Sequence, residues 1–253
     1  SPVVDKEKIR DEKIKQAEPY EGYWEDSYDF VFSKLQKYFE DPEFSRAIEF
    51  GSGRGKFFQN YAEYFEDVVA IESDWQNRDS AMENAYWNNM GHIEFRSSED
   101  DGEDLERSSF DFVFVAQSFR HMKPEEAEDM IEKASELLRS GGILVVFVPN
   151  LKKGQKRFLK THLDQEENYV TEAVEEKEFC SIDREDSSEL GIQRYKAEDF
   201  HEKDGFNLEE EIYFHDLILP DFIDSYISRD NVINKSFFKG KFGSEMAVVL
   251  QKE

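Results

Sequence analysis

Two carboxylates and three glycines stand at spacings that could hold a nucleotide-like ligand. Glu49 ends a short apolar stretch, and Gly51, Gly53 and Gly55 follow it at every second position. Glycine can adopt positive φ angles and lets a ligand approach the backbone closely. A helical pattern begins near Lys56, and the first amides of a helix are unpaired donors at the positive end of its dipole. This turn therefore predicts a nucleotide-like ligand.

The second carboxylate, Glu72, follows the apolar, β-branched stretch Val68–Ile71. Such a stretch is typical of a strand that is buried on both faces. An acid at the end of the second strand can accept hydrogen bonds from both hydroxyls of a ribose, as in dinucleotide-binding folds. The plainer alternative is an acid that opens the next helix.

The spacing of the glycines excludes two other kinds of phosphate-binding turn. A dinucleotide fingerprint needs a glycine three residues after Gly53, where this chain has Lys56. A Walker-type loop needs Gly-Lys-Ser or Gly-Lys-Thr, and neither follows here. The turn must be assigned on its own pattern.

That pattern, Glu49-x-Gly51-x-Gly53-x-Gly55, resembles the first motif of class I S-adenosylmethionine-dependent methyltransferases. Two further matches are Phe110-Asp111-Phe112-Val113, similar to the family's opening of strand four, and Gly141-Gly142, which lead into the apolar stretch Ile143–Val148. The resemblance covers residues 46–150 by motif and residues 205–251 by topology alone.

The resemblance implies an α/β, Rossmann-like methyltransferase fold. We expect a seven-stranded, mostly parallel sheet with an antiparallel last strand, helices on both faces and an insertion after strand five. Helices are expected at 28–39, 77–89 with a left-handed cap at Met90-Gly91, and 124–138. The chain is then one methyltransferase domain, 1–253, divided into a helical cap (1–45), a cofactor-binding core (46–150), an insertion over the substrate or a solvated helical cover (151–204), and C-terminal strands (205–253).

The same resemblance implies S-adenosylmethionine as cofactor and S-adenosylhomocysteine as product. Glu49 would serve the methionine amino group, and Glu72 would bind the ribose. The other residues expected at the cofactor are Trp24, Gly51, Ser52, Gly53, Gly55, Ser73, Asp74, Ser98, Glu99, Ala116, Gln117 and Ser118.

His121 is the most suggestive titratable residue for catalysis, because a neutral imidazole could take a proton from a nucleophile. Methyl transfer can also proceed mostly by positioning, which would leave His121 a structural residue of its loop. The residues expected near the acceptor are Tyr23, Arg120, His121 and Asn150. We predict no metal site, since the single cysteine, Cys180, excludes a cysteine-built zinc site and an intrachain disulfide.

The composition argues against nucleic acid and membranes as partners. The formal net charge is −26, from 58 acidic and 32 basic residues, and that sign repels phosphate backbones and anionic lipid. No stretch approaches the roughly 20 apolar residues of a membrane helix. These features favour a cytoplasmic, acidic protein, whose surface also suggests a salt-tolerant source.

The sequence leaves several classes of methyl acceptor as alternatives. A small molecule with an amine, hydroxyl or carboxyl group fits the acidic surface. The basic run Lys152, Lys153, Lys156, Arg157 and Lys160 keeps an RNA or protein methyltransferase as the alternative. A protein that binds S-adenosylmethionine without turnover is the third possibility. No feature of the sequence predicts the oligomeric state.

Overall fold

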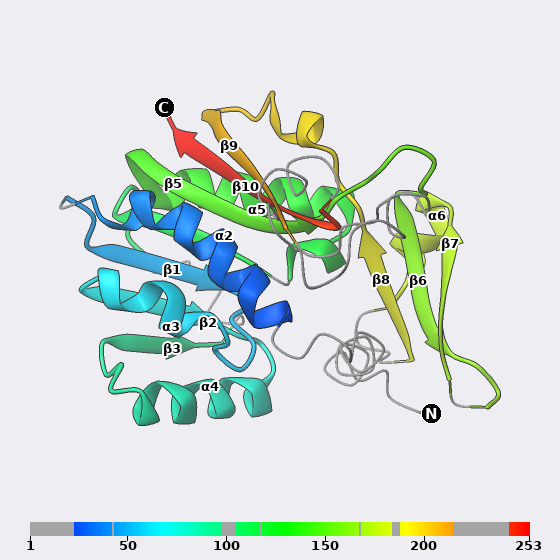
Figure 1. Ribbon diagram of the computed structural model, residues 1–253, viewed down its shortest axis with the longest axis horizontal. Coiled ribbons are helices and arrows are strands. Elements are labelled where there is room, and N and C mark those ends of the chain that lie inside the picture. Colours follow the sequence, from blue (N-terminus) through cyan, green and yellow to red (C-terminus); the bar gives the residue numbers. More distant parts are fainter. Residues whose placement is uncertain are drawn as a thin grey trace, which may run out of the picture.

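A seven-stranded sheet organises the chain in the order β3-β2-β1-β4-β5-β10-β9 (Figure 1). The computed structural model describes residues 23–41, 43–97, 105–116, 118–166, 168–183, 188–214 and 243–253. Strands β3 to β5 pair in parallel, whereas β10 is antiparallel to both β5 and β9. The expected Rossmann-like sheet with an antiparallel last strand is confirmed. The strands are β1 Arg46–Phe50, β2 Asp67–Ile71, β3 Ile93–Arg96, β4 Phe110–Val115, β5 Leu138–Pro149, β9 Phe206–Phe214 and β10 Glu245–Lys252.

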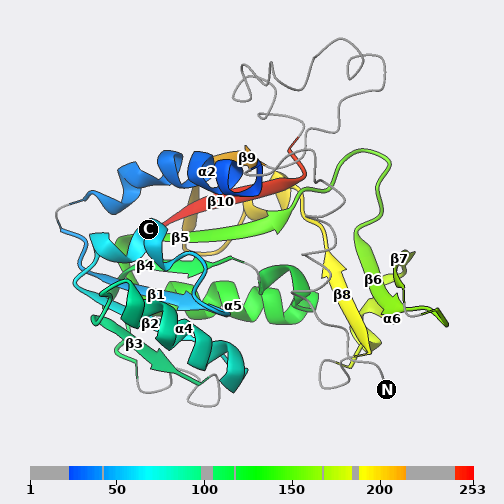
Figure 2. The ribbon, with the colours of Figure 1, turned by 60° about the horizontal axis from the view of Figure 1, so that its bottom comes forward.

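Helices cover both faces of this sheet (Figure 2). Alternate residues of β4 separate the two apolar layers, since Phe112 and Phe114 face α2 and α3 while Val113 and Val115 face α5. The expected apolar face of residues 28–39 is buried as α2 in the first layer. The helices of the core are α2 Tyr23–Phe39, α3 Phe58–Tyr61, η2 Ala62–Tyr64, α4 Trp75–Trp87, η4 Phe119–His121 and α5 Pro124–Leu137.

The helix after the glycine turn begins later than expected. The sequence pattern placed its start near Lys56, but α3 begins at Phe58 and spans only four residues. Gly53 and Gly55 both have positive φ angles, which a right-handed helix cannot include. The turn must therefore finish before a helix can start.

The end of α4 also differs from the expected cap at Met90-Gly91. Asn89 holds the left-handed conformation, with a φ of 58°. The amide of Met90 donates to the Ala85 carbonyl at 2.9 Å, and the amide of Asn89 donates to the Tyr86 carbonyl at 3.2 Å. These are the two bonds of a Schellman motif, in which asparagine replaces the more usual glycine.

The insertion is a small antiparallel sheet rather than a helical cover. Its order is β7-β6-β8, and Figures 1 and 2 place it beyond the edge at which β1 and β5 end. The elements are β6 Phe158–Leu163, β7 Tyr169–Val174, α6 Glu176–Ser181, β8 Glu189–Gln193 and η5 Ala197–Phe200. Within the described ranges, no helix is long and apolar enough to cross a membrane.

Asp111 fixes the amino-terminal edge of the sheet. Its Oδ2 accepts hydrogen bonds from the amides of Ser45 and Arg46 at 2.7 and 2.8 Å, and its Oδ1 pairs with Arg139. The carboxylate is 4% exposed. The acid in the Phe-Asp-x-Val phrase is thus a structural residue.

We expect Asp111→Asn to lower the free energy of unfolding by about 2–3 kcal/mol, because it weakens a buried, charge-assisted network. Urea-induced unfolding measures the change. Asp67→Asn, at the exposed first residue of β2, is the matched control and should change stability by less than about 0.5 kcal/mol. Equal effects of the two substitutions would contradict the assigned role.

Candidate functional site

Those predicted cofactor residues that follow strands β1, β2 and β4 and are described by the structure meet at the carboxyl edge of the sheet. Strand β1 lies between β2 and β4, so the segments that follow these three strands are neighbours. Open α/β sheets bind ligands at this edge. Glu49 is the next-to-last residue of β1, Glu72 directly follows β2, and Ala116 directly follows β4.

The three glycines of the turn have different roles. A Cβ atom at Gly51 would lie 2.5 Å from Ser118 Oγ, and one at Gly55 would lie 2.3 Å from the Phe58 ring. These two glycines are required by internal packing. A Cβ atom at Gly53, whose φ is +56°, would meet no atom of the described residues within 4 Å. Gly53 therefore borders open space, where a ligand can approach the backbone.

Glu72 holds the glycine turn and the start of α4 together. Its Oε2 accepts a hydrogen bond from the Gly53 amide at 2.7 Å, and its Oε1 accepts one from the Asp74 amide at 2.9 Å. Each carboxylate oxygen has about two lone-pair positions, so Oε2 can accept a further bond, and Oε1 can do so if a ligand displaces its 3.4 Å contact with Ser73 Oγ. The side chain is 9% exposed, and its orientation is fixed before any ligand arrives.

Glu49 is buried and bonded to a residue that the sequence did not single out. The Tyr61 hydroxyl donates to Glu49 Oε2 at 2.7 Å, and Glu49 is 1% exposed. Burial raises the pKa of the Glu49 carboxyl to about 8, with a smaller raising effect from Glu72, while the Tyr61 hydrogen bond lowers it. Glu49 is therefore mostly protonated at neutral pH in the cofactor-free protein.

Ser52, which lies between Glu49 and Glu72 in the sequence, has a buried hydroxyl group. Its side chain is 6% exposed, and among the described residues its Oγ has no hydrogen-bond partner. A buried hydroxyl without a partner is costly. Together with the space at Gly53 and the two carboxyls, this hydroxyl makes the turn suitable for a polar ligand such as a nucleoside.

Two asparagines of α4 hold the outer side of the turn. Arg54 Nε donates to Asn77 Oδ1 at 3.3 Å, and Asn84 Nδ2 donates to the Gly55 carbonyl at 3.0 Å. Asp74 caps the helix, because its Oδ1 accepts from the amides of residues 76 and 77. Sequence reasoning missed both asparagines, since no motif spacing marks them.

The β4 loop closes the site from the other side. Ala116 is buried, and Ser118 Oγ donates to the Phe50 carbonyl at 3.2 Å. Ser73 Oγ reaches Glu72 Oε1 at 3.4 Å. These residues surround the turn as expected, and their contacts to a cofactor stay predictions.

The residues predicted at the acceptor are engaged elsewhere in the fold. Arg120 forms a bidentate ion pair with Glu245, with both bonds at 2.9 Å, and Asn150 Nδ2 donates to the Gly243 carbonyl at 3.0 Å. His121 Nδ1 donates to the Gly191 carbonyl at 2.6 Å. Because a carbonyl oxygen can only accept, this bond places a proton on Nδ1.

Five predicted residues have side chains outside the described part of the structure. Tyr23 and Trp24 form the first turn of α2, and only their backbone is described. Ser98, Glu99 and Gln117 lie outside the described residues. Over the parts of the chain that are described, no three His, Cys, Asp or Glu side chains are grouped to hold a metal ion.

Comparisons with known proteins agree with this arrangement. Residues 48–146 match the family model described as a methyltransferase domain. A relative from Anoxybacillus flavithermus, named an uncharacterized methyltransferase, is 31% identical over 98 residues, which is 39% of this chain and 44% of the relative. The chain thus aligns with less than half of that relative's length.

Two solved structures share the fold at low sequence identity. One is a 1,6-didemethyltoxoflavin-N1-methyltransferase from Burkholderia thailandensis with bound 1,6-didemethyltoxoflavin and S-adenosylhomocysteine, at a TM-score of 0.55 and 11% identity over 100% of this chain and 92% of that one. The other is the [4+2]-cyclase SpnF, at a TM-score of 0.56 and 14% identity over 90% and 83% of the two chains.

Proposed function

We propose that this protein, whose residues 48–146 match the methyltransferase-domain family model, transfers a methyl group from S-adenosylmethionine to a small-molecule acceptor. The observation that carries the proposal is the position of Glu72. Its carboxylate bridges the amides of Gly53 and Asp74 at 2.7 and 2.9 Å, beside the one glycine of the turn that faces open space. A fixed acid beside exposed backbone suits a ribose.

The residues of this edge fit the cofactor in a consistent order. Glu72 would accept the ribose hydroxyls, Ser52 would offer its buried hydroxyl, and Glu49 would serve the amino group of the methionine end. When bound, S-adenosylmethionine supplies a methyl group already activated on a sulfonium. The chain then has to position the acceptor and exclude water, with Ala116 and Ser118 forming the floor beside Gly51.

His121 is the group most suited to hold a proton near the acceptor. Its Nδ1 donates to the Gly191 carbonyl at 2.6 Å, and this bond orients the imidazole, which in its neutral form can take a proton. Because Gly191 belongs to β8, the inserted sheet would set the orientation of this side chain. Positioning alone supplies much of the acceleration in such a displacement.

A small-molecule acceptor is favoured over RNA by the charges of the basic run. Arg157 pairs with Asp199 through bonds of 2.7 and 3.0 Å. Lys160 lies 2.7 Å from Glu178 and 3.5 Å from each of Glu172 and Glu189, and the hydrogen bond to Glu178 contributes most to raising the pKa of Lys160. Two cations of the run are thus neutralised. RNA binding that weakens with salt would restore the alternative.

Calorimetric titration with S-adenosylhomocysteine tests the proposal. We expect micromolar binding, followed by transfer of radiolabelled methyl to a member of a panel of small amines, alcohols and carboxylic acids. Absence of binding at millimolar ligand, at both low and high salt, would overturn it. Binding without turnover on any acceptor would favour a different chemistry on the same fold, because one fold can carry unrelated reactions.

Gly53→Ala tests whether a ligand contacts the backbone at this turn. The substitution places a methyl group in the open space at the turn and strains a positive φ by about 1–2 kcal/mol. We expect at least a tenfold loss of S-adenosylhomocysteine affinity by calorimetry. Gly154→Ala is the matched control, because Gly154 also has a positive φ, +86°, and open space around a Cβ atom. Equal affinities of the two variants would contradict a ligand at Gly53.

A further inference from the structure

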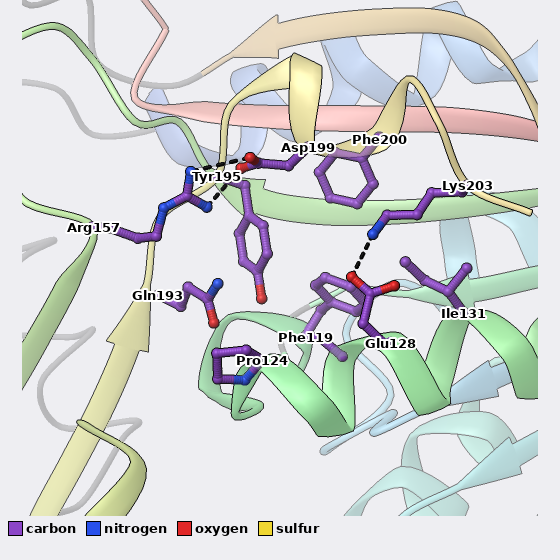
Figure 3. Close-up of a pocket in the computed structure, with 11 residues that line it drawn as sticks. Phe119, Pro124, Glu128, Ile131, Arg157, Gln193, Tyr195, Asp199, Phe200 and Lys203 are labelled. Atoms are coloured by element: carbon purple, nitrogen blue, oxygen red, sulfur yellow. Dashed lines mark hydrogen bonds and ion pairs between the residues drawn. The ribbon is translucent and has the colours of Figure 1, made fainter. Parts of the chain in front are cut away.

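A second pocket lies outside the cofactor edge, between α5 and the continuation of β8 (Figure 3). Its volume is about 200 Å³, below the roughly 300 Å³ at which drug-sized sites begin. None of the residues assigned to the glycine turn, Glu72 or the end of β4 lines it. The pocket therefore suits a single-ring molecule and is separate from the proposed cofactor site.

Three aromatic rings form one wall of the pocket. The ring centroid of Tyr195 lies 5.4 Å from that of Phe119 and 5.6 Å from that of Phe200. Ala127 and Ile131 of α5 also line the pocket and pack in the same apolar cluster as these rings. Such a wall favours a flat, apolar ring that can pack against aromatic faces and edges.

The four charged side chains that line the pocket form two ion pairs. Arg157 is paired with Asp199, and Lys203 is paired with Glu128; all four line the pocket, as Figure 3 shows. A charged ligand would have to break one of these pairs or enter without a counter-charge. The pocket thus favours an uncharged ligand.

Gln193 supplies the polar contact that orients such a ligand. The residue is 5% exposed, and its Oε1 is buried without a hydrogen-bond partner among the described residues. Figure 3 shows its amide at the pocket beside Tyr195. A buried acceptor needs a donor, so the missing partner is an N–H or O–H group.

We propose that this pocket is a second ligand site, which binds a small, uncharged, planar aromatic molecule through an N–H donor to Gln193. The ring lies beside Tyr195 and Pro124 at the pocket, and the donor bonds to Oε1. The site joins the core to the inserted segment, because Phe119 and Ala127 belong to the core, Gln193 ends the inserted strand β8 and Phe200 follows it. It adjoins the cofactor edge, since Ser118 beside Gly51 directly precedes Phe119, the first residue of η4.

Benzamide is the probe for this site, because it combines one ring with a carboxamide that can donate to Oε1. Methyl benzoate is the matched ligand control, with nearly the same shape and no N–H group. Binding to the full chain is measured by saturation-transfer NMR and by the shift in thermal unfolding. We expect benzamide to bind with a Kd of about 1 mM, as its few atoms allow, and methyl benzoate to bind at least tenfold more weakly.

Two variants locate the site. Gln193→Leu removes the acceptor, and Ala127→Leu fills the pocket from α5; each should weaken benzamide binding at least tenfold. Gln76→Leu, on the exposed side of α4, should bind benzamide as the wild type does. Titration of the same samples with S-adenosylhomocysteine reports separately on the methyltransferase proposal and on folding.

Three results would overturn the second site. They are no benzamide binding to the wild type at tens of millimolar, equal binding of benzamide and methyl benzoate, or undiminished benzamide binding by both pocket variants. If one variant does not fold, the other still decides the location. None of these outcomes depends on methyl transfer.

Discussion

Glu72→Gln is expected to weaken binding of S-adenosylhomocysteine at least a hundredfold. The substitution removes the charge that strengthens two ribose hydrogen bonds, each worth about 1.5–3 kcal/mol when charge-assisted. It also turns an NH₂ group toward the amide of Gly53 or Asp74, which now donates to a carboxylate oxygen at 2.7 or 2.9 Å. Ligand contact and loop geometry are lost together, and calorimetric titration measures the result.

Glu66→Gln is the control for this prediction. Glu66 is exposed and lies in the loop that leads into β2, at the opposite end of that strand from Glu72. The control should bind S-adenosylhomocysteine as the wild type does. Wild-type affinity in Glu72→Gln would remove the ribose contact from this residue. Tighter binding of NAD than of S-adenosylhomocysteine by the wild type would favour a dinucleotide enzyme instead.

Cofactor binding is expected to release a proton from Glu49. The pKa of this carboxyl is about 8 in the cofactor-free protein because of burial, and an ammonium group placed beside it favours the ionised form. Affinity should therefore rise with pH by up to about tenfold per unit from about pH 6 and level off near the cofactor-free pKa. Calorimetry in buffers with different ionisation enthalpies counts the proton.

Stability of the cofactor-free protein should change in the opposite direction. The pKa of Glu49 in the folded protein, about 8, is above its ordinary value of 4.5. The contribution of this carboxyl group to the free energy of unfolding is therefore fully present below the ordinary pKa. It is lost as the pH rises through the pKa of the folded protein. The loss amounts to about 1.4 kcal/mol per pH unit within that window. Urea-induced unfolding across the window measures this slope.

Glu49→Gln separates the two effects. Glutamine resembles the protonated acid and can still accept from Tyr61, so this variant should lack the stability slope and release no proton while binding the cofactor more weakly. Tyr61→Phe serves as the control, since it keeps the titrating group and should keep proton release. Identical pH slopes in Glu49→Gln and the wild type would show that Glu49 does not titrate in this range.

The sequence predicted the parts of the fold that depend on local pattern. The apolar stretches before Glu72 and after Gly142 form β2 and β5, and the glycine spacing after Glu49 forms a turn at the carboxyl edge. Each of these features has a physical cause within a few residues, such as a positive φ or burial on both faces. The order of the core strands followed from the resemblance that these motifs carry.

What the sequence did not predict depends on contacts between distant residues. The ion pair of Arg120 with Glu245 joins residues 125 apart, and the bond of His121 to Gly191 joins residues 70 apart. Neither contact corresponds to a residue spacing that could be recognised in the sequence. The inserted strands were missed because β7 lacks the alternation that marks a half-buried strand: its middle four residues are all exposed.

The place of β10 in the sheet has a consequence for how the protein is made. This strand, Glu245–Lys252, lies between β5 and β9 and pairs with both, although it follows the other described strands in sequence. A ribosome delivers the chain from its amino end, so β5 and β9 wait with unpaired edges until residue 252 has left the exit tunnel. Exposed edges invite association with other chains. Closure of the sheet therefore waits for this late segment, and the edges of β5 and β9 that it covers stay open to such association until it arrives.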